Sequence, residues 1–181
     1  MRIIFVLTRR KRYINNRYVL SIAFIVAIVS ATIVSGEQST ESTGNYEMDL
    51  GQVYGAINAV KFAKEICAEA YPDYIEKNEV AYQKWRTQYK TFLQEMQQHF
   101  LVMTYREAGE DPQRQVEVLR KVDDKLEGMK KGLKDMMRSK GENSFRSMCQ
   151  TYPVYLITDS TNIEYFYADQ VSTIRKGLKK K

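Results

Sequence analysis

The sequence predicts an all-α domain, an antiparallel bundle of four to five helices stapled by one disulfide and preceded by an N-terminal signal or anchor segment. Apolar residues recur at three- and four-residue steps along most of the chain, which is the period of an amphipathic helix. No alternating strand pairs with hairpin turns appear. The helical segments are joined by short connections, which favour antiparallel neighbours.

The first 36 residues are basic and apolar. They contain six basic residues and no acidic one, so the formal net charge of +6 belongs entirely to this segment. The other 145 residues hold 22 basic and 22 acidic side chains. A neutral domain lacks the excess positive charge with which proteins hold a phosphate backbone, so we expect no nucleic acid as a partner.

The apolar run at 18–34 follows the basic cluster and precedes the small residues Ser35 and Gly36. This order is typical of a secretory signal peptide, and we expect cleavage near Gly36, which makes the mature protein periplasmic or secreted. The alternative is an uncleaved anchor with the domain outside the cytoplasm, in which residues 18–34 contact the membrane. Seventeen helical residues span about 25 Å, slightly less than the hydrocarbon core of a bilayer.

The local composition predicts that the chain is divided into four segments. Residues 1–36 form the signal peptide or signal anchor, 37–45 a polar, disordered linker, 46–176 the helical bundle domain, and 177–181 a basic tail. Acidic residues dominate 37–79 and basic residues dominate 120–140. We therefore expect attraction between helices of opposite charge, although each exposed pair contributes little.

The two cysteines, Cys67 and Cys149, both lie in the part expected to be exported. Outside the cytoplasm, two cysteines most simply form one disulfide, with two buried free thiols as the alternative. Each is closely followed by Tyr-Pro, at 71–72 and at 152–153, which should end a helix. We predict that the disulfide joins the C-terminal ends of two helices and contributes about 4–5 kcal/mol through loop entropy.

The first predicted helix covers roughly 47–70 and carries Cys67 on its apolar stripe. The second, roughly 73–105, has the strongest pattern of the chain. Its stripe consists of Ile75, Tyr82, Trp85, Tyr89, Phe92, Met96, Phe100 and Met103.

The third predicted helix opens with Asp111 as N-cap and Pro112 at its first position, and it ends near residue 139. Asn143 is predicted to cap a short fourth helix. Residues 154–158 form a brief apolar connection, and Asp159 or the following serine caps a last helix.

No catalytic site is expected. The chain lacks a nucleophile elbow, a phosphate-binding glycine loop and a metalloprotease helix motif. Its single histidine, His99, is interpreted as a structural or surface residue without a catalytic role. Two cysteines and one histidine do not form a recognisable metal-ligand pattern, so we expect no metal and no cofactor. An enzyme whose site is assembled only by folding is the second alternative.

Two surfaces are candidates for contacts. The first is an aromatic patch beside the disulfide, formed by Tyr71, Tyr74, Tyr152 and Tyr155. The second is a basic, methionine-rich helix for a membrane or a partner groove, with Lys125, Lys130, Lys131, Lys134 and Arg138. The sequence thus predicts an exported protein that acts by binding or structural interaction, with a protein or an envelope surface as its partner. A membrane-anchored or membrane-surface protein is the first alternative.

Overall fold

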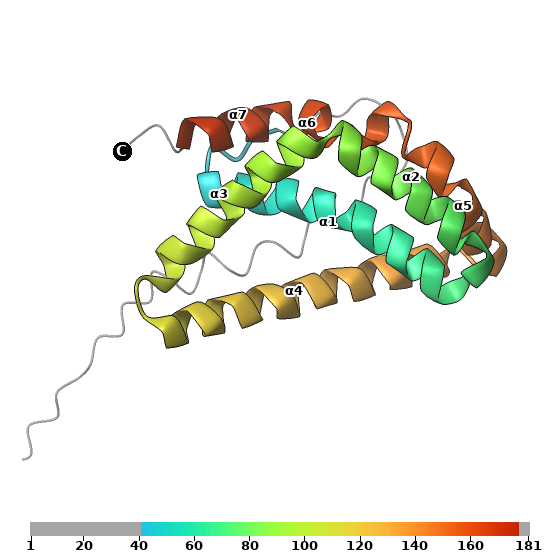
Figure 1. Cartoon of the computed structure of the whole chain (residues 1–181), viewed down its shortest axis with the longest axis horizontal. Coiled ribbons are helices and arrows are strands. Elements are labelled where there is room, and N and C mark those ends of the chain that lie inside the picture. Colours follow the sequence, from blue (N-terminus) through green and yellow to red (C-terminus); the bar gives the residue numbers. More distant parts are fainter. Residues whose placement is uncertain (1–40, 178–181) are drawn as a thin grey trace, which may run out of the picture. The chain divides into compact units, whose positions relative to one another are not determined.

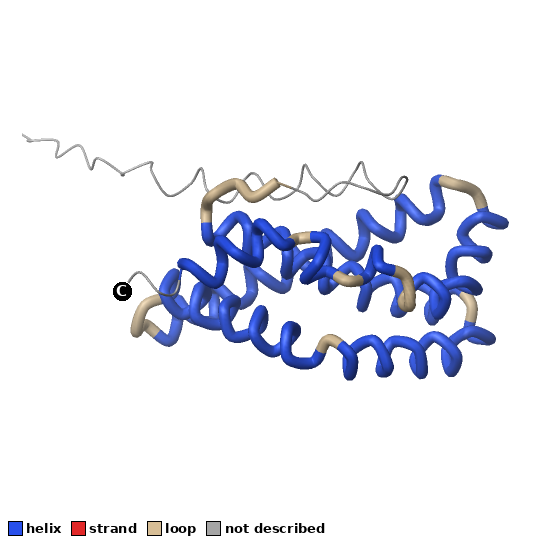
Figure 2. The backbone as a smooth tube through the Cα atoms, turned by 90° about the horizontal axis from the view of Figure 1, so that it is seen from above, coloured by secondary structure: helices blue, strands red, loops and turns tan. Residues whose placement is uncertain are grey.

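A computed structural model describes residues 41–177, and nearly all of them are helical, with no strand in this range (Figure 2). The predicted all-α class is therefore confirmed for the described part. The predicted signal or anchor segment, residues 37–40 of the predicted linker and residues 178–181 of the basic tail lie outside the described residues.

Seven α-helices and two short 3-10 turns form the described chain, where the sequence predicted four to five helices. They are α1 (Tyr46–Ala70), η2 (Pro72–Tyr74), α2 (Ile75–Gln88), α3 (Lys90–Ala108), α4 (Pro112–Ser139), α5 (Glu142–Tyr155), η3 (Asp159–Thr161), α6 (Ile163–Phe166) and α7 (Ala168–Gly177).

The predicted long second helix is divided at Tyr89 into α2 and α3. Tyr89 leaves helical geometry with φ −100° and ψ 17°, although no proline or glycine lies there. Its backbone N–H still donates to the Trp85 carbonyl, and its carbonyl accepts from the Leu93 N–H. Hydrogen bonding thus continues across the break, and the chain changes direction without a loop.

Helix α1 is the centre of the fold. It packs against all six other α-helices of the described chain, and in Figure 1 it lies between α7 and α4. Such a helix needs apolar or small residues on several faces rather than on one stripe. Those of α1 include Leu50, Val53, Ala56, Ala59, Val60, Phe62, Ala63 and Ile66.

Two neighbours of α1 run in opposite directions. Helix α5 is antiparallel to α1, because Cys149 pairs with Cys67 while Tyr152 reaches back to Val60. Helix α4 runs parallel to α1: Met129 lies opposite Gly55, and Lys134 pairs with Glu69. The two helices are not consecutive: α2 and α3 run back between them (Figure 1), so this parallel pair does not contradict antiparallel packing of consecutive helices.

The helix ends are fixed by side-chain caps and glycines. Asn45 accepts hydrogen bonds from the first N–H groups of α1, and Asp111 caps α4 as predicted. Helix α5 begins directly after Gly141, whose φ of 87° lies in the left-handed region that favours glycine. The predicted cap at Asn143 is therefore wrong, since this residue already lies within the first turn of α5.

The C-terminal connection also differs from the prediction. Residues 154 and 155 still belong to α5, so only 156–158 of the predicted connection lie between helices. Asn162, not Asp159, caps the helix that follows, and its side chain accepts from the Tyr165 N–H. A further break at Tyr167 then separates α6 from α7.

The described end of the predicted linker is held against the domain. The carboxylate of Asp49, fully buried on α1, accepts hydrogen bonds from the Ser42 hydroxyl and from the backbone and hydroxyl of Thr43. The Ser42 hydroxyl also lies 2.8 Å from that of Thr173 on α7. Hydrogen bonds therefore hold residues 42 and 43 against α1 and α7 before α1 begins.

Candidate functional site

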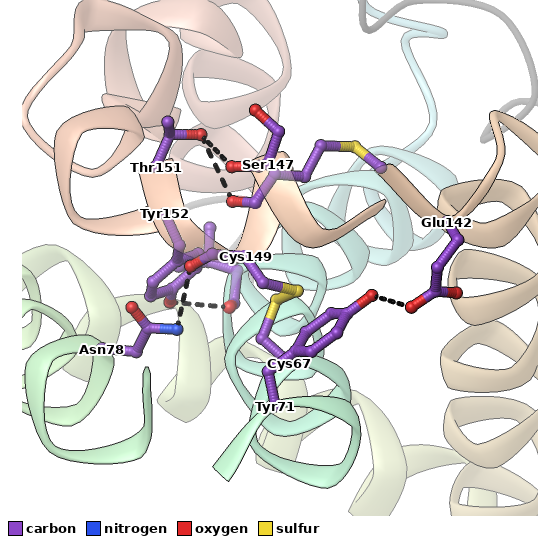
Figure 3. The surroundings of a disulfide bond; sticks show 10 residues. Cys67, Tyr71, Asn78, Glu142, Ser147, Cys149, Thr151 and Tyr152 are labelled. Atoms are coloured by element: carbon purple, nitrogen blue, oxygen red, sulfur yellow. Dashed lines mark hydrogen bonds between the residues drawn. A yellow bond between two sulfur atoms is a disulfide. The ribbon is translucent and has the colours of Figure 1, made fainter. Parts of the chain in front are cut away.

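The sulfur atoms of Cys67 on α1 and Cys149 on α5 form the predicted disulfide (Figure 3). The two residues are 1% and 0% exposed, and their Cα atoms are 5.2 Å apart. Phe62, Ile66, Leu133, Met137 and Phe145 surround them in one of the two core clusters. A disulfide that solvent does not reach is protected from exchange, so its role is structural.

The second Tyr-Pro does not end its helix. Pro153 lies inside α5, which continues to Tyr155, whereas the first Tyr-Pro ends α1 at Ala70 as predicted. Proline has no N–H, so it cannot donate to the carbonyl four residues earlier, that of Cys149. The Nδ2 group of Asn78 on α2 donates to this carbonyl at 3.2 Å instead (Figure 3). A side chain from another helix thus replaces the missing bond.

Tyr71 and Tyr74 lie at the end of α1 and in η2, where they pack on the start of α5. The Tyr71 ring is 5.9 Å from that of Tyr74 and 5.2 Å from that of Phe145, and its hydroxyl donates to Glu142. The guanidinium of Arg146 lies 5.5 Å from the Tyr71 ring centre. These contacts hold two chain segments together, and both rings stay partly exposed.

Tyr152 and Tyr155 do not join that pair in one surface. Tyr152 is 3% exposed, and its hydroxyl donates to the carbonyl of Val60 at 3.0 Å, so burial raises its pKa strongly. It belongs to the core, which removes it from the predicted patch. Tyr155 is 40% exposed at the last position of α5, whereas Tyr71 contacts the first turns of this helix, about 20 Å away along its axis.

Two further exposed apolar residues lie close to Tyr155 in the sequence. Val154 is 58% exposed and Ile157 is 83% exposed. We call Val154, Tyr155 and Ile157 the α5-end patch. Burial raises the pKa of the Tyr155 phenol.

The predicted basic surface of α4 is partly engaged by α1. Lys130 pairs with Glu65 at 3.0 Å and with Glu69 at 2.9 Å, and Lys134 pairs with Glu69 at 2.8 Å. Hydrogen bonds from Lys134 and then Lys130 lower the pKa of Glu69 to about 2. The expected attraction between the acidic and basic segments is therefore present at this helix pair.

The other three basic residues of this surface remain exposed. The guanidinium of Arg138 lies 5.7 Å from the Phe145 ring centre, whereas Lys125 and Lys131 form no ion pair with another described residue. A membrane or partner groove would therefore meet fewer free cations on α4 than the sequence predicts.

His99 is buried, which excludes the surface alternative, and charged groups of α3 and α7 lie near it. Its ring faces Tyr46 of α1, and Glu95 lies one turn earlier on α3. Arg175 of α7 donates hydrogen bonds of 2.7 and 2.6 Å to Glu95 and one of 2.7 Å to Glu164. No spacing in the sequence indicates this network, because its members are far apart along the chain.

Of the acidic residues at the α3–α4 turn, Asp111 caps α4, and Glu107 lines an open depression with Arg114 and Glu117. No cluster of His, Cys, Asp and Glu between residues 41 and 177 is arranged to bind a metal ion. No helix in this range combines the length and apolar character needed to cross a membrane.

Comparisons with known proteins give no relative from which a function could be transferred. No protein family matches the sequence, and no curated protein or solved structure matches it either. The function must therefore be argued from the residues themselves.

Proposed function

We propose that this protein is exported and acts outside the cytoplasm by binding another macromolecule, with no catalytic role. The observation that carries the proposal is the buried Cys67–Cys149 disulfide. Structural disulfides form and persist in oxidising compartments and are rare in the cytosol. The basic leader and the apolar run at 18–34 agree with the same destination.

The α5-end patch is the contact surface that we propose. Its three side chains are neighbours in sequence, and exposed apolar groups of this kind become buried when a partner binds. Tyrosine suits such a surface because it offers a large apolar ring together with a hydroxyl. The partner is a protein or a component of the cell envelope with an apolar recess.

Location is tested by fractionating the producing cells and measuring the intact mass of the protein. A mature chain beginning at Glu37 in the extracytoplasmic fraction supports export with cleavage. A chain that retains residues 1–36 and stays with the membranes supports the anchored alternative. Recovery of the protein in the cytosol with two titratable thiols would refute export in either form.

Binding is tested with a photo-crosslinking amino acid at Ile157, compared with the same probe at Gln150, which is exposed on the middle of α5. We expect one dominant adduct with the probe at 157 and none with the probe at 150. A probe at Val154 should form the same adduct, and Ile157→Asp in that protein should abolish it. Equal adducts at 157 and 150 would count against the patch.

The anchored form is the second candidate. It is favoured by the 17-residue apolar run and by its basic flank, which would stay in the cytoplasm. In that form the linker at 37–45 would connect the membrane segment to the domain, and the partner would have to lie near the membrane surface. The intact-mass measurement separates it from the cleaved form.

A further inference from the structure

The only histidine of the chain lies where the two ends of the described domain meet. His99 on α3 is 4% exposed. The hydroxyl oxygen of Tyr46, the first residue of α1, is 3.2 Å from its Nδ1 and 3.2 Å from its backbone carbonyl oxygen. Tyr46 therefore fixes the start of α1 to α3 at a buried position.

The same tyrosine contacts the end of α7. A Cβ atom placed on Gly177, the last residue of α7, would lie 2.4 Å from Cδ2 of Tyr46. Only a glycine allows the backbone of α7 to lie this close to the ring. We call Tyr46, His99 and Gly177 the terminal latch, because these three residues join the first and last helices to α3.

Two carboxylates near the latch already bind the guanidinium of Arg175. Glu95, one turn before His99, accepts two hydrogen bonds from Arg175 of α7, which also binds Glu164 of α6. Two further charged groups act on the pKa of Tyr46 with opposite signs: Arg106 of α3 lowers it and Glu47 of α1 raises it. Glu95 can therefore pair with a protonated His99 only if it gives up its hydrogen bonds to Arg175.

Protonation of His99 is therefore unfavourable in the folded state. Burial is the largest cause that lowers its pKa; Glu95 acts against this shift and Arg175 adds to it. A histidine whose folded pKa is lowered binds its proton more readily when the latch is open. The latch is thus fully stable above the ordinary value of about 6.5 and is weakened as the pH falls below it.

We infer that the stability of the terminal latch depends on pH. At neutral pH the latch holds the start of α1 and the end of α7 on α3, and mild acidification weakens these contacts. The inference does not rest on export or on the α5-end patch, since it involves other residues. Its consequence would be greater freedom for residues 41–46 and for α7, while the disulfide-bonded half of the domain stays folded.

The first test is an NMR titration of the imidazole in the full-length protein, prepared without a histidine tag. The signal is unambiguous because the chain has one histidine. We expect its midpoint below that of a histidine peptide. In an Arg175→Gln variant the midpoint should rise, because Glu95 is freed to pair with the imidazolium. A wild-type midpoint at or above the peptide value would overturn the inference.

The second test is hydrogen exchange between pH 7.5 and 4.5. Protection at residues 42–50 and 170–177, corrected for the intrinsic exchange rate, should fall in one step as His99 titrates. Each unit of pKa lowering permits up to a tenfold fall. Residues 145–152, near the disulfide, serve as the internal reference and should show no such step.

His99→Asn is the matched control, because its amide occupies the place of Nδ1 without titrating. The step should be lost in this variant, whatever its absolute protection. The same step in wild type and in His99→Asn would assign the pH dependence to carboxylates and overturn the inference. The inference would also be overturned if the wild-type protein kept constant hydrogen-exchange protection at 42–50 and 170–177 from pH 7.5 to 4.5.

Discussion

The side-chain amide of Asn78 donates a hydrogen bond to the backbone carbonyl of Cys149, the carbonyl that Pro153 leaves without its helical donor. Asn78 is 1% exposed, and its Oδ1 atom is buried without a hydrogen-bond partner. A polar side chain has thus been brought into the core to satisfy one backbone group. This relationship connects α2 to the helix that carries the disulfide.

The relationship predicts coupling between Asn78 and Pro153. Asn78→Leu removes the donor at similar volume and should lower the free energy of unfolding by about 1–3 kcal/mol, because it leaves the Cys149 carbonyl unpaired. In a Pro153→Ala background, an N–H at position 153 can supply the helical bond. The cost of Asn78→Leu should then be smaller by roughly 1 kcal/mol in urea unfolding. Strict additivity of the two changes would contradict this account.

The disulfide itself should account for a large share of stability. A Cys67→Ala/Cys149→Ala variant is expected to lose up to about 4–5 kcal/mol, since the bond closes a loop of 82 residues. Refolding of the wild type under reducing conditions, with both thiols free, should give a similar loss. Thiol titration of the unreduced, denatured protein should find none. Two titratable thiols would refute the bond.

The ion pairs between α1 and α4 predict a defined effect of acid. The pKa of Glu69 is lowered to about 2 by Lys134 and Lys130, so its contribution to stability is present above its ordinary value of 4.5. That contribution is lost as the pH falls from about 4.5 to 2. Because Glu69 is exposed, the loss should stay below about 1 kcal/mol. A Lys134→Gln variant should raise the NMR pKa of Glu69, whereas Lys131→Gln, one turn away, should not.

Close packing at the latch predicts opposite signs for two glycine substitutions. Gly177→Ala places its Cβ against the Tyr46 ring and should destabilise the fold by roughly 1–3 kcal/mol. Gly132→Ala on α4, where a Cβ meets no atom within 4 Å, should stabilise it by about 0.5–1 kcal/mol. Thermal unfolding of both variants checks the pair. Equal effects of the same sign would contradict the packing around Tyr46.

Local signals in the sequence predicted several helix ends and the disulfide. The first Tyr-Pro ends α1, and Asp111 with Pro112 opens α4, because capping and proline geometry act within a few residues. The pairing of Cys67 with Cys149 was predicted from the expected compartment. These inferences do not depend on which helices become neighbours.

What the sequence did not predict depends on tertiary packing. Pro153 is tolerated inside α5 because Asn78 supplies the missing hydrogen bond, and Tyr152 is buried because α1 covers it. The break at Tyr89 carries no proline or glycine, so no local signal marks it. The only available signal for Asn78 was the unpaired carbonyl that a proline within a helix would create.

The contact between Tyr46 and Gly177 means that the first and last helical turns of the described domain are adjacent in space. The order in which the helices occur along the chain can therefore be changed without moving them. A circular permutant, with a short flexible linker joining these ends and new termini opened at the exposed turn 109–111, would keep α1 enclosed by the same six helices.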